Sequence, residues 1–179
     1  MKEPVWRGLG RLSAALGLSL WLLPAAAGAA SPATDEAQAR AAVEGALRWL
    51  AASQIQEGDG AGGWAAPKPE YRPATAGLAG LAFLANGHTP AEGEHAGVVR
   101  AALRFVLARQ APDGYFGQGD ASGMYIHAIC SIFSLSCLGM TGVADDEPDL
   151  AGRCGRAVRV ILDAQQVRRS PAEGGGWRY

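Results

Sequence analysis

The chain has 179 residues, and its 16 lysine and arginine side chains against 17 aspartate and glutamate side chains give a formal net charge of −1. A nearly neutral chain gives no electrostatic reason to expect nucleic acid or an anionic membrane surface as a partner. The length supports one domain with a core of its own.

The first 30 residues have the layout of a secretory signal peptide. Three basic residues precede an apolar run over 12–23, and small residues follow over 25–30. The apolar run is shorter than an ordinary membrane span, so we expect cleavage after Ala29 or Ala30, export to the periplasm or the extracellular space, and no stable membrane span. A retained N-terminal anchor is the alternative. The exported part, 31–179, carries 13 basic and 16 acidic side chains, for a net charge of −3.

A pattern of a small residue, an apolar residue, an arginine and two further apolar residues occurs three times along the chain. Each copy leads to a glutamine, the glutamines stand 56 and 55 residues apart, and a glycine-rich turn with an aromatic residue follows each of them. Self-similarity at a fixed period indicates a repeat architecture. The predicted domain over 31–179 divides into repeats at about 37–87, 92–142 and 149–179.

Each repeat begins with a predicted amphipathic helix. In all three copies, apolar residues fall at positions i, i+3, i+4 and i+7, which lie on one face of an α-helix. The arginine of each copy falls on the opposite side, where water solvates it. We therefore predict three outer helices whose apolar stripes share one register. The stripes consist of Val43, Ala46, Leu47 and Leu50, then Val99, Ala102, Leu103 and Val106, then Cys154, Ala157, Val158 and Ile161.

Two segments of another kind, 75–85 and 125–138, lie between the outer helices. They are apolar on nearly every face, and a helix of this kind has to be buried on all sides. We predict that they are inner helices, ended by the glycine-containing turns at 86–87 and 139–142. The sequence from Thr89 to Glu92 matches a capping box that starts the next outer helix. The predicted fold class is all-α, with the helices in the order outer, inner, outer, inner, outer.

The three cysteines belong to the predicted helices. Cys130 and Cys137 are seven residues apart on one helix, and the resulting separation of about 10 Å is more than a disulfide spans. Cys154 pairs with one of them only if its own helix places it correctly. We expect all three to be small core residues.

A glutamine at the end of an outer helix, followed by a glycine and an aromatic residue in the turn to an inner helix, resembles the repeat shared by squalene-hopene cyclases and the β subunits of protein prenyltransferases. The runs Met124 to His127 and Gly175 to Tyr179 are most similar to those of secreted bacterial proteins with prenyltransferase and squalene oxidase repeats. The resemblance covers roughly residues 37–179. It implies a terpenoid cyclase-like α/α toroid, in which inner helices line a central cavity and outer helices form a ring.

This chain would supply about two and a half hairpins of that toroid. Because the third outer helix lacks an inner partner, we expect a fragment of a longer protein. A short, open protein of three hairpins is the alternative.

The resemblance also implies a structural role for the glutamines. In the cyclases this side chain caps a neighbouring helix and lies near the turn aromatic, and the contact stabilises the repeat. The spacings here, ten, five and twelve residues, depart from the tight cyclase motif, so the second copy is the best match. The matching pairs are Gln54 with Trp64, Gln110 with Tyr115, and Gln165 with Trp177.

The catalytic motifs of the resembling enzymes do not occur in this chain. Cyclases protonate an alkene with an Asp-x-Asp-Asp motif, and the nearest sequence, 145–149, is better explained as a solvated acidic cap of the third outer helix. Prenyltransferases hold zinc through Asp, Cys and His, whereas His127 and Cys130 alone share a helix face here. We therefore predict no catalytic residue, no metal and no cofactor in this segment.

Candidate ligand contacts come from one polar line and from aromatic residues at the turns. His127, Ser131 and Ser134 form a line along the second inner helix, which either faces the cavity and a ligand or packs with its serines bonded to carbonyls one turn back. The aromatic residues either form a collar for an apolar or sugar-like ligand or wedge the hairpins together, and we assign Trp64 and Trp177 to packing. The candidate ligand-binding residues are Tyr71, Tyr115, Tyr125, His127 and Ser131.

We therefore expect an exported toroid protein that holds an apolar or extended small molecule, or a protein partner, without catalysis in this segment. The alternative is an isoprenoid cyclase or prenyl transferase whose catalytic residues lie beyond Tyr179. A third possibility is an assembly module similar to the thioester-containing domains of complement-type proteins, although their Cys-Gly-Glu-Gln motif is absent from this sequence.

Overall fold

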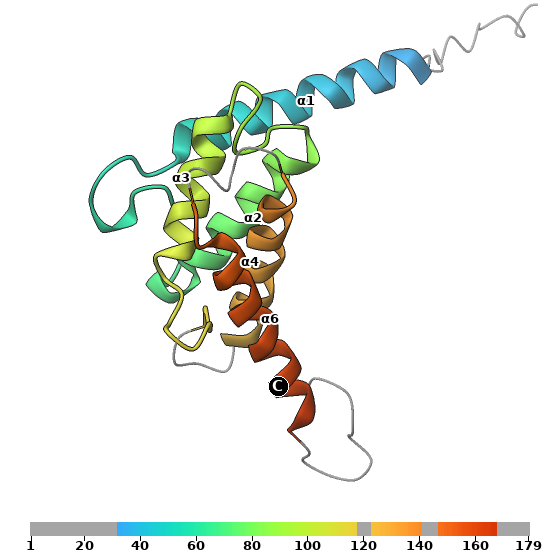
Figure 1. Ribbon diagram of the computed structural model, residues 1–179. Coiled ribbons are helices and arrows are strands. Elements are labelled where there is room, and N and C mark those ends of the chain that lie inside the picture. Colours follow the sequence, from blue (N-terminus) through green and yellow to red (C-terminus); the bar gives the residue numbers. More distant parts are fainter. Residues whose placement is uncertain (1–31, 118–122, 141–146, 168–179) are drawn as a thin grey trace, which may run out of the picture. The chain divides into compact units, whose positions relative to one another are not determined.

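The computed structural model describes residues 32–117, 123–140 and 147–167, with side chains from Asp35 onward. These residues form five α-helices and two short 3₁₀ helices and contain no strand, which confirms the predicted all-α class (Figure 1). The predicted signal peptide and the acidic residues Asp145 and Asp146 lie outside the described residues.

Every predicted helix is present in the expected order. None of the helices in the described residues combines the length and the apolar character that a bilayer span requires. The α-helices are α1 (Pro32–Ser53), α2 (Arg72–Ala85), α3 (Ala96–Leu107), α4 (Gly123–Leu138) and α6 (Leu150–Gln166), and the 3₁₀ helices are η1 (Gly58–Gly60) and η2 (Pro69–Tyr71).

The chain divides into two compact units between Ala39 and Arg40. In the first unit, residues 32–39 are helical, and their described side chains, from Asp35 on, are exposed. The second unit contains the rest of α1 and all the other helices. The core, the turns between helices and the candidate binding surfaces all belong to this second unit.

The two inner helices, α2 and α4, pack directly against each other (Figure 1). Two glycines of α2 make the contact close: Gly77 lies against Ile129, and Gly80 lies against the ring of Phe133. The outer helix α3 packs against both inner helices, and α6 packs against α4. The core therefore lies between an inner pair and the outer helices that cover it.

The three apolar stripes are buried to different degrees. In α3 all four stripe residues are buried, and in α6 Cys154 and Ala157 are buried while the other two are half-buried. In α1 only Leu47 is buried, whereas Val43 and Ala46 are exposed. The register of the stripes is thus shared, but their environment is not.

The prediction that the inner helices are buried on all sides is wrong. The outer helices cover one side of α2 and α4, and the opposite side carries exposed apolar residues. Leu78 of α2 and Ile132 of α4 are each 55% exposed. These helices are apolar on every face because one side packs in the core and the other side is apolar but exposed.

The predicted capping box does not begin a helix. The Thr89 hydroxyl oxygen accepts hydrogen bonds from the backbone N–H groups of Ala91 and Glu92, at 3.2 and 2.9 Å, but α3 begins only at Ala96. The reason is Gly93, whose φ of +98° is left-handed and interrupts a right-handed helix. The expected glycine stop of α2 is confirmed, because Gly87 has a φ of +81°.

All three cysteines are buried and form no disulfide, which confirms their predicted role in the core. Burial raises the pKa of Cys130 and of Cys137 to about 12, and it also raises the pKa of Cys154. Because the thiolate is the reactive form, these thiols are inert at neutral pH.

The close contact of α2 with α4 leads to a stability prediction. A Cβ at position 80 would overlap the ring of Phe133, which is itself fully buried, so Gly80→Ala should lower the free energy of unfolding by about 1–3 kcal/mol. Urea denaturation measures this change. The matched control is Gly97→Ala in α3, where an added Cβ meets nothing within 4 Å. Equal stability of the two variants would contradict the packing described here.

Candidate functional site

A buried glutamine joins the first repeat to the second. Gln54 follows the last residue of α1, and its side chain is 6% exposed. Its Nε2 group donates one hydrogen bond to the carbonyl of Gly62 in the same turn and another to the carbonyl of Val98 in the first turn of α3, both at 3.0 Å. One amide therefore holds a turn and the next outer helix together.

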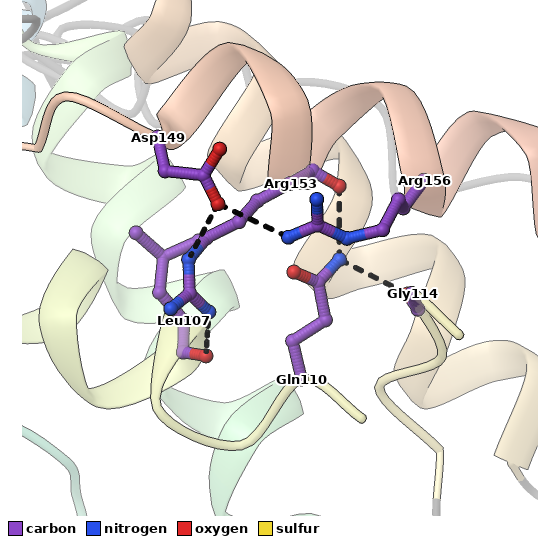
Figure 2. A network of polar contacts seen from close by, with 6 residues as sticks. All are labelled: Leu107, Gln110, Gly114, Asp149, Arg153 and Arg156. Atoms are coloured by element: carbon purple, nitrogen blue, oxygen red, sulfur yellow. Dashed lines mark hydrogen bonds and ion pairs between the residues drawn. The ribbon is translucent and has the colours of Figure 1, made fainter. Parts of the chain in front are cut away.

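The same arrangement joins the second repeat to the third (Figure 2). The Nε2 group of Gln110 donates to the carbonyl of Gly114 at 3.0 Å and to the carbonyl of Arg153, near the start of α6, at 2.9 Å. The guanidinium of Arg153 in turn donates to the carbonyl of Leu107 at 2.9 Å. We call the contact of a glutamine amide with these two carbonyls the glutamine clasp.

An acidic residue completes the network around the second clasp. Asp149, at the N-terminal end of α6, forms ion pairs with Arg153 at 3.8 Å and with Arg156 at 3.1 Å (Figure 2). The three side chains are between one-third and two-thirds exposed, so water screens these pairs and they contribute little to stability. Asp149 thus lies at the helix end where the acidic cap was predicted, although its side chain makes no capping hydrogen bond.

The two turns correspond to each other at the anchor points around their clasps. The residue after each glutamine closes the turn through its N–H group, as Ile55 donates to Gly63 at 2.9 Å and Ala111 donates to Tyr115 at 2.8 Å. The glycines whose carbonyls receive the clasp, Gly62 and Gly114, both have positive φ, +86° and +98°. The extra residues of the first turn lie between these shared anchor points.

This register adds to one sequence expectation and corrects another. The clasp forms in the first copy despite its ten-residue spacing from Gln54 to Trp64, because the additional residues loop out between the anchors. The counterpart of Trp64 is Phe116, not Tyr115. Both of these aromatic residues are buried, and the Trp64 indole N–H donates to the Leu50 carbonyl at 2.9 Å.

The third clasp stays a prediction. Gln165 lies half-buried near the end of α6. Trp177, which we paired with it, lies outside the described residues.

His127 lies in the core between repeats. Its side chain is fully buried, and its Nδ1 accepts a hydrogen bond from the N–H of Phe116 at 3.2 Å. The other nitrogen, Nε2, must then carry the proton and donates it to the carbonyl of Ala157 in α6 at 3.0 Å. Burial lowers the pKa of this imidazole, although the Ala157 carbonyl acts in the opposite direction. With both nitrogens bonded to backbone, His127 functions here as a third link between a turn and an outer helix.

The serines of the same polar line are also buried, on the side of α4 away from Tyr125 and Ile132. The alternative in which they bond to carbonyls one turn back is wrong, because the hydroxyls of Ser131 and Ser134 have no hydrogen-bond partner. Both are about 1% exposed. This small polar pair thus fills space in the packed side of α4.

The three candidate tyrosines occupy different positions. Tyr125 is 51% exposed at the start of α4, on the same side as Ile132. Tyr71 ends η2, is half-buried, and lies under the ammonium of Lys68, which is 5.3 Å from the ring centroid. Tyr115 is half-buried with its ring 5.2 Å from that of His127. Of these residues, Tyr125 is the one the structure places openly on an apolar surface.

The sequence reasoning missed this surface, which we call the open inner face. One member lies on α2 and the others lie on α4, and they are hydrophobic but exposed. A binary apolar pattern could not separate them from core residues, since both kinds carry the same side chains. The open inner face consists of Leu78, Tyr125, Ile132 and Leu135.

A polar cavity was missed as well. It has a volume of about 460 Å³ and lies between α1 and the segment joining α2 to α3. His88 and His95 contribute rings whose centroids are 4.8 Å apart. Helical periodicity could not predict this pair, because a turn separates the two residues in the sequence. The arginines and glutamates balance one another, so the lining favours no single ligand charge. The charged lining residues are Arg40, Glu44, Arg48 and Glu94.

In the described part of the chain, no three side chains of histidine, cysteine, aspartate or glutamate lie close enough together to hold a metal ion. His127 and Cys130 share a helix face. Both ring nitrogens of His127 are bonded to backbone groups, and the raised pKa of Cys130 keeps its thiol protonated.

Comparisons with known proteins add no further assignment. No protein-family model matches the chain, no curated protein is significantly similar to it, and no solved structure matches it.

The clasp leads to a prediction on stability. Gln110→Ala removes two hydrogen bonds and leaves the carbonyls of Gly114 and Arg153 without these donors, so we expect a loss of about 1–3 kcal/mol in the free energy of unfolding. The matched control is Gln166→Ala in α6, whose side chain is exposed. If both variants unfold at the same urea concentration, the clasp does not stabilise the repeat.

The buried imidazole leads to a prediction on pH. Because the pKa of His127 in the folded chain lies below its ordinary value of 6.5, the unfolded chain takes up a proton at this residue first. The stabilisation is therefore complete above about pH 6.5 and is lost as the pH falls towards the folded-state pKa. Urea unfolding of the wild type and of His127→Gln at pH 8 and pH 5 should give a difference that narrows at pH 5. A difference that does not change with pH would contradict this role.

Proposed function

We propose that this chain is an exported repeat protein of the prenyltransferase and squalene-cyclase type, with about two and a half helix hairpins of an α/α toroid. In this proposal the open inner face binds an apolar or extended ligand. The segment contributes binding and carries out no catalysis of its own.

The repeated clasp supports the toroid. Two successive turns use the same glutamine contact to fix the next outer helix, and the inner helices pack side by side behind it. A hairpin unit that is joined to its neighbour by the same contact each time generates a regular curved array. In such an array the inner helices share one concave side, where a ligand is enclosed on several faces.

The single observation that carries the function is the open inner face. Ile132 follows Leu78 by the same number of residues as Tyr125 follows Tyr71, so Leu78 and Ile132 occupy equivalent positions of α2 and α4. Both side chains are 55% exposed. The exposure is therefore a property of the repeat and not an accident of one helix. Contiguous exposed apolar residues in a protein commonly form a binding surface.

The groups with reactive chemistry support a binding role over catalysis. The His127 imidazole uses both nitrogens for backbone contacts, and the buried cysteines are held as thiols. The side chains of the open inner face are themselves aliphatic and phenolic. They offer contact area to a ligand but no acid or base of the strength that alkene protonation requires.

Binding can be tested with an apolar fluorescent probe, 1-anilinonaphthalene-8-sulfonate, and with farnesol as an isoprenoid competitor. The double variant Leu78→Ser, Ile132→Ser removes two exposed apolar side chains, and we expect it to weaken probe binding about tenfold or more. Tyr125→Ala should weaken it to a smaller extent. Because these side chains are largely exposed, the melting temperature should change little.

Leu162→Ser is the matched control, since Leu162 is 51% exposed on the outer helix α6. Equal loss of binding in the control and in the double variant would overturn the proposal. Conversion of farnesyl diphosphate by the chain would favour the isoprenoid enzyme instead.

A further inference from the structure

The three outer helices can be aligned residue by residue through the clasp. When the helices are aligned on Gln54, Gln110 and Gln165, each position of α1 corresponds to the residue 56 positions later in α3. Each position of α3 corresponds in turn to the residue 55 positions later in α6. We call three of these positions in each helix the acceptor positions. They are Ala42, Gly45 and Trp49 in α1, Val98, Ala101 and Phe105 in α3, and Arg153, Arg156 and Val160 in α6.

In α3 the acceptor positions receive the turn of the preceding repeat. The Val98 carbonyl accepts the hydrogen bond from Gln54, and Gly62 lies so close to Ala101 that a Cβ on this glycine would overlap the Ala101 backbone. The ring of Phe105 covers Gly63 and is itself 3% exposed. The turn and the helix thus fit together through an amide, a glycine and an aromatic ring.

In α6 the acceptor positions receive the next turn in the same manner. The Arg153 carbonyl accepts the hydrogen bond from Gln110, and a Cβ on Gly114 would overlap the backbone of Arg156. The surface used is the same although the side chains differ. Recognition therefore depends on the helix backbone and on room for the glycine turn.

In α1 the same surface is open. A Cβ on Gly45 would meet nothing within 4 Å, Ala42 and Ala46 are exposed, and Trp49 is 68% exposed. Trp49 is the counterpart of the buried Phe105. No turn of the described residues covers Trp49, whose position corresponds to the one from which Phe105 covers the turn glycine in the next repeat.

We propose that the acceptor positions of α1 bind the third glutamine and glycine turn of a second copy of this chain. The sequence supplies the residues of this predicted turn, Gln165 followed by Gly175, Gly176 and Trp177, of which 168–179 lie outside the described residues. It matches the order of Gln54, Gly62, Gly63 and Trp64 in the turn that docks on α3. These residue types are the ones that dock on α3, and Gly45 leaves space on α1 for a turn glycine.

The contact joins two different surfaces, so it is head-to-tail. A contact between two different surfaces can repeat from one copy to the next, so association continues into a ring or a filament. The contact uses the register of the repeat and does not depend on the ligand proposed above. Failure of ligand binding would therefore leave it standing.

The test is sedimentation velocity of the exported chain over a wide range of concentrations. We expect the wild type to associate as its concentration rises, and Gly45→Leu to raise the dissociation constant about tenfold or more by filling the docking surface. Gly155→Leu is the matched control, because a Cβ on this exposed glycine of α6 also meets nothing within 4 Å and the position lies off the acceptor surface. Urea unfolding checks that both variants fold as the wild type does.

A mixing experiment tests the direction of the contact. Gly45→Leu blocks the α1 surface, and the double variant Gln165→Ala, Trp177→Ala removes the turn, so each should be defective alone. Mixed together, they should form dimers and nothing larger, because only one pair of intact surfaces remains. A wild type that stays monomeric at every concentration, as it would if the turn docked on α1 of its own chain, overturns the proposal. Association of Gly45→Leu at wild-type strength, or failure of the mixture to form dimers, also overturns it.

Discussion

Two carbonyl oxygens, one in a turn and one in the next outer helix, accept hydrogen bonds from a single buried glutamine amide, and the arrangement of the helices depends on this contact. The two N–H groups of a primary amide lie in one plane at a fixed angle. Gln54 and Gln110 therefore set both the distance and the direction from each turn to the following helix. Glycines with positive φ make the approach possible, because any larger residue at Gly62 or Gly114 would overlap the helix backbone.

The open inner face depends on this outer attachment. Since α3 and α6 are held at the turns, α3 packs against both inner helices and α6 packs against α4, while Leu78 and Ile132 stay exposed. His127 strengthens the attachment from within, as it links the turn at Phe116 to Ala157 of α6. A polar residue in an apolar helix thus serves the packed side, while aliphatic residues face outward.

The sequence predicted the helices, their order and the glutamine repeat, because periodicity of 3.6 residues and a fixed repeat length are properties of the chain alone. It could not predict which apolar side of an inner helix is covered, since Leu78 and the buried Phe83 are equally hydrophobic. The start of α3 was missed because the capping signal at Thr89 was used in a turn that Gly93 separates from the helix. Phe116 was missed as the counterpart of Trp64 because equivalence in a turn follows from hydrogen bonds and not from counting residues.

The loop in the first turn has a consequence of its own. Residues 56–61, including η1, lie between the closing bonds of Ile55 and the clasp carbonyl of Gly62, and the second turn reaches the same geometry without them. The clasp geometry is therefore independent of the length of the chain between these anchors, although Arg109 of the second repeat also bonds to Asp59 within the loop. In evolution this makes the loop a place where repeats can acquire different sequences one by one. In the laboratory it is a natural point at which to insert a foreign peptide or an affinity tag.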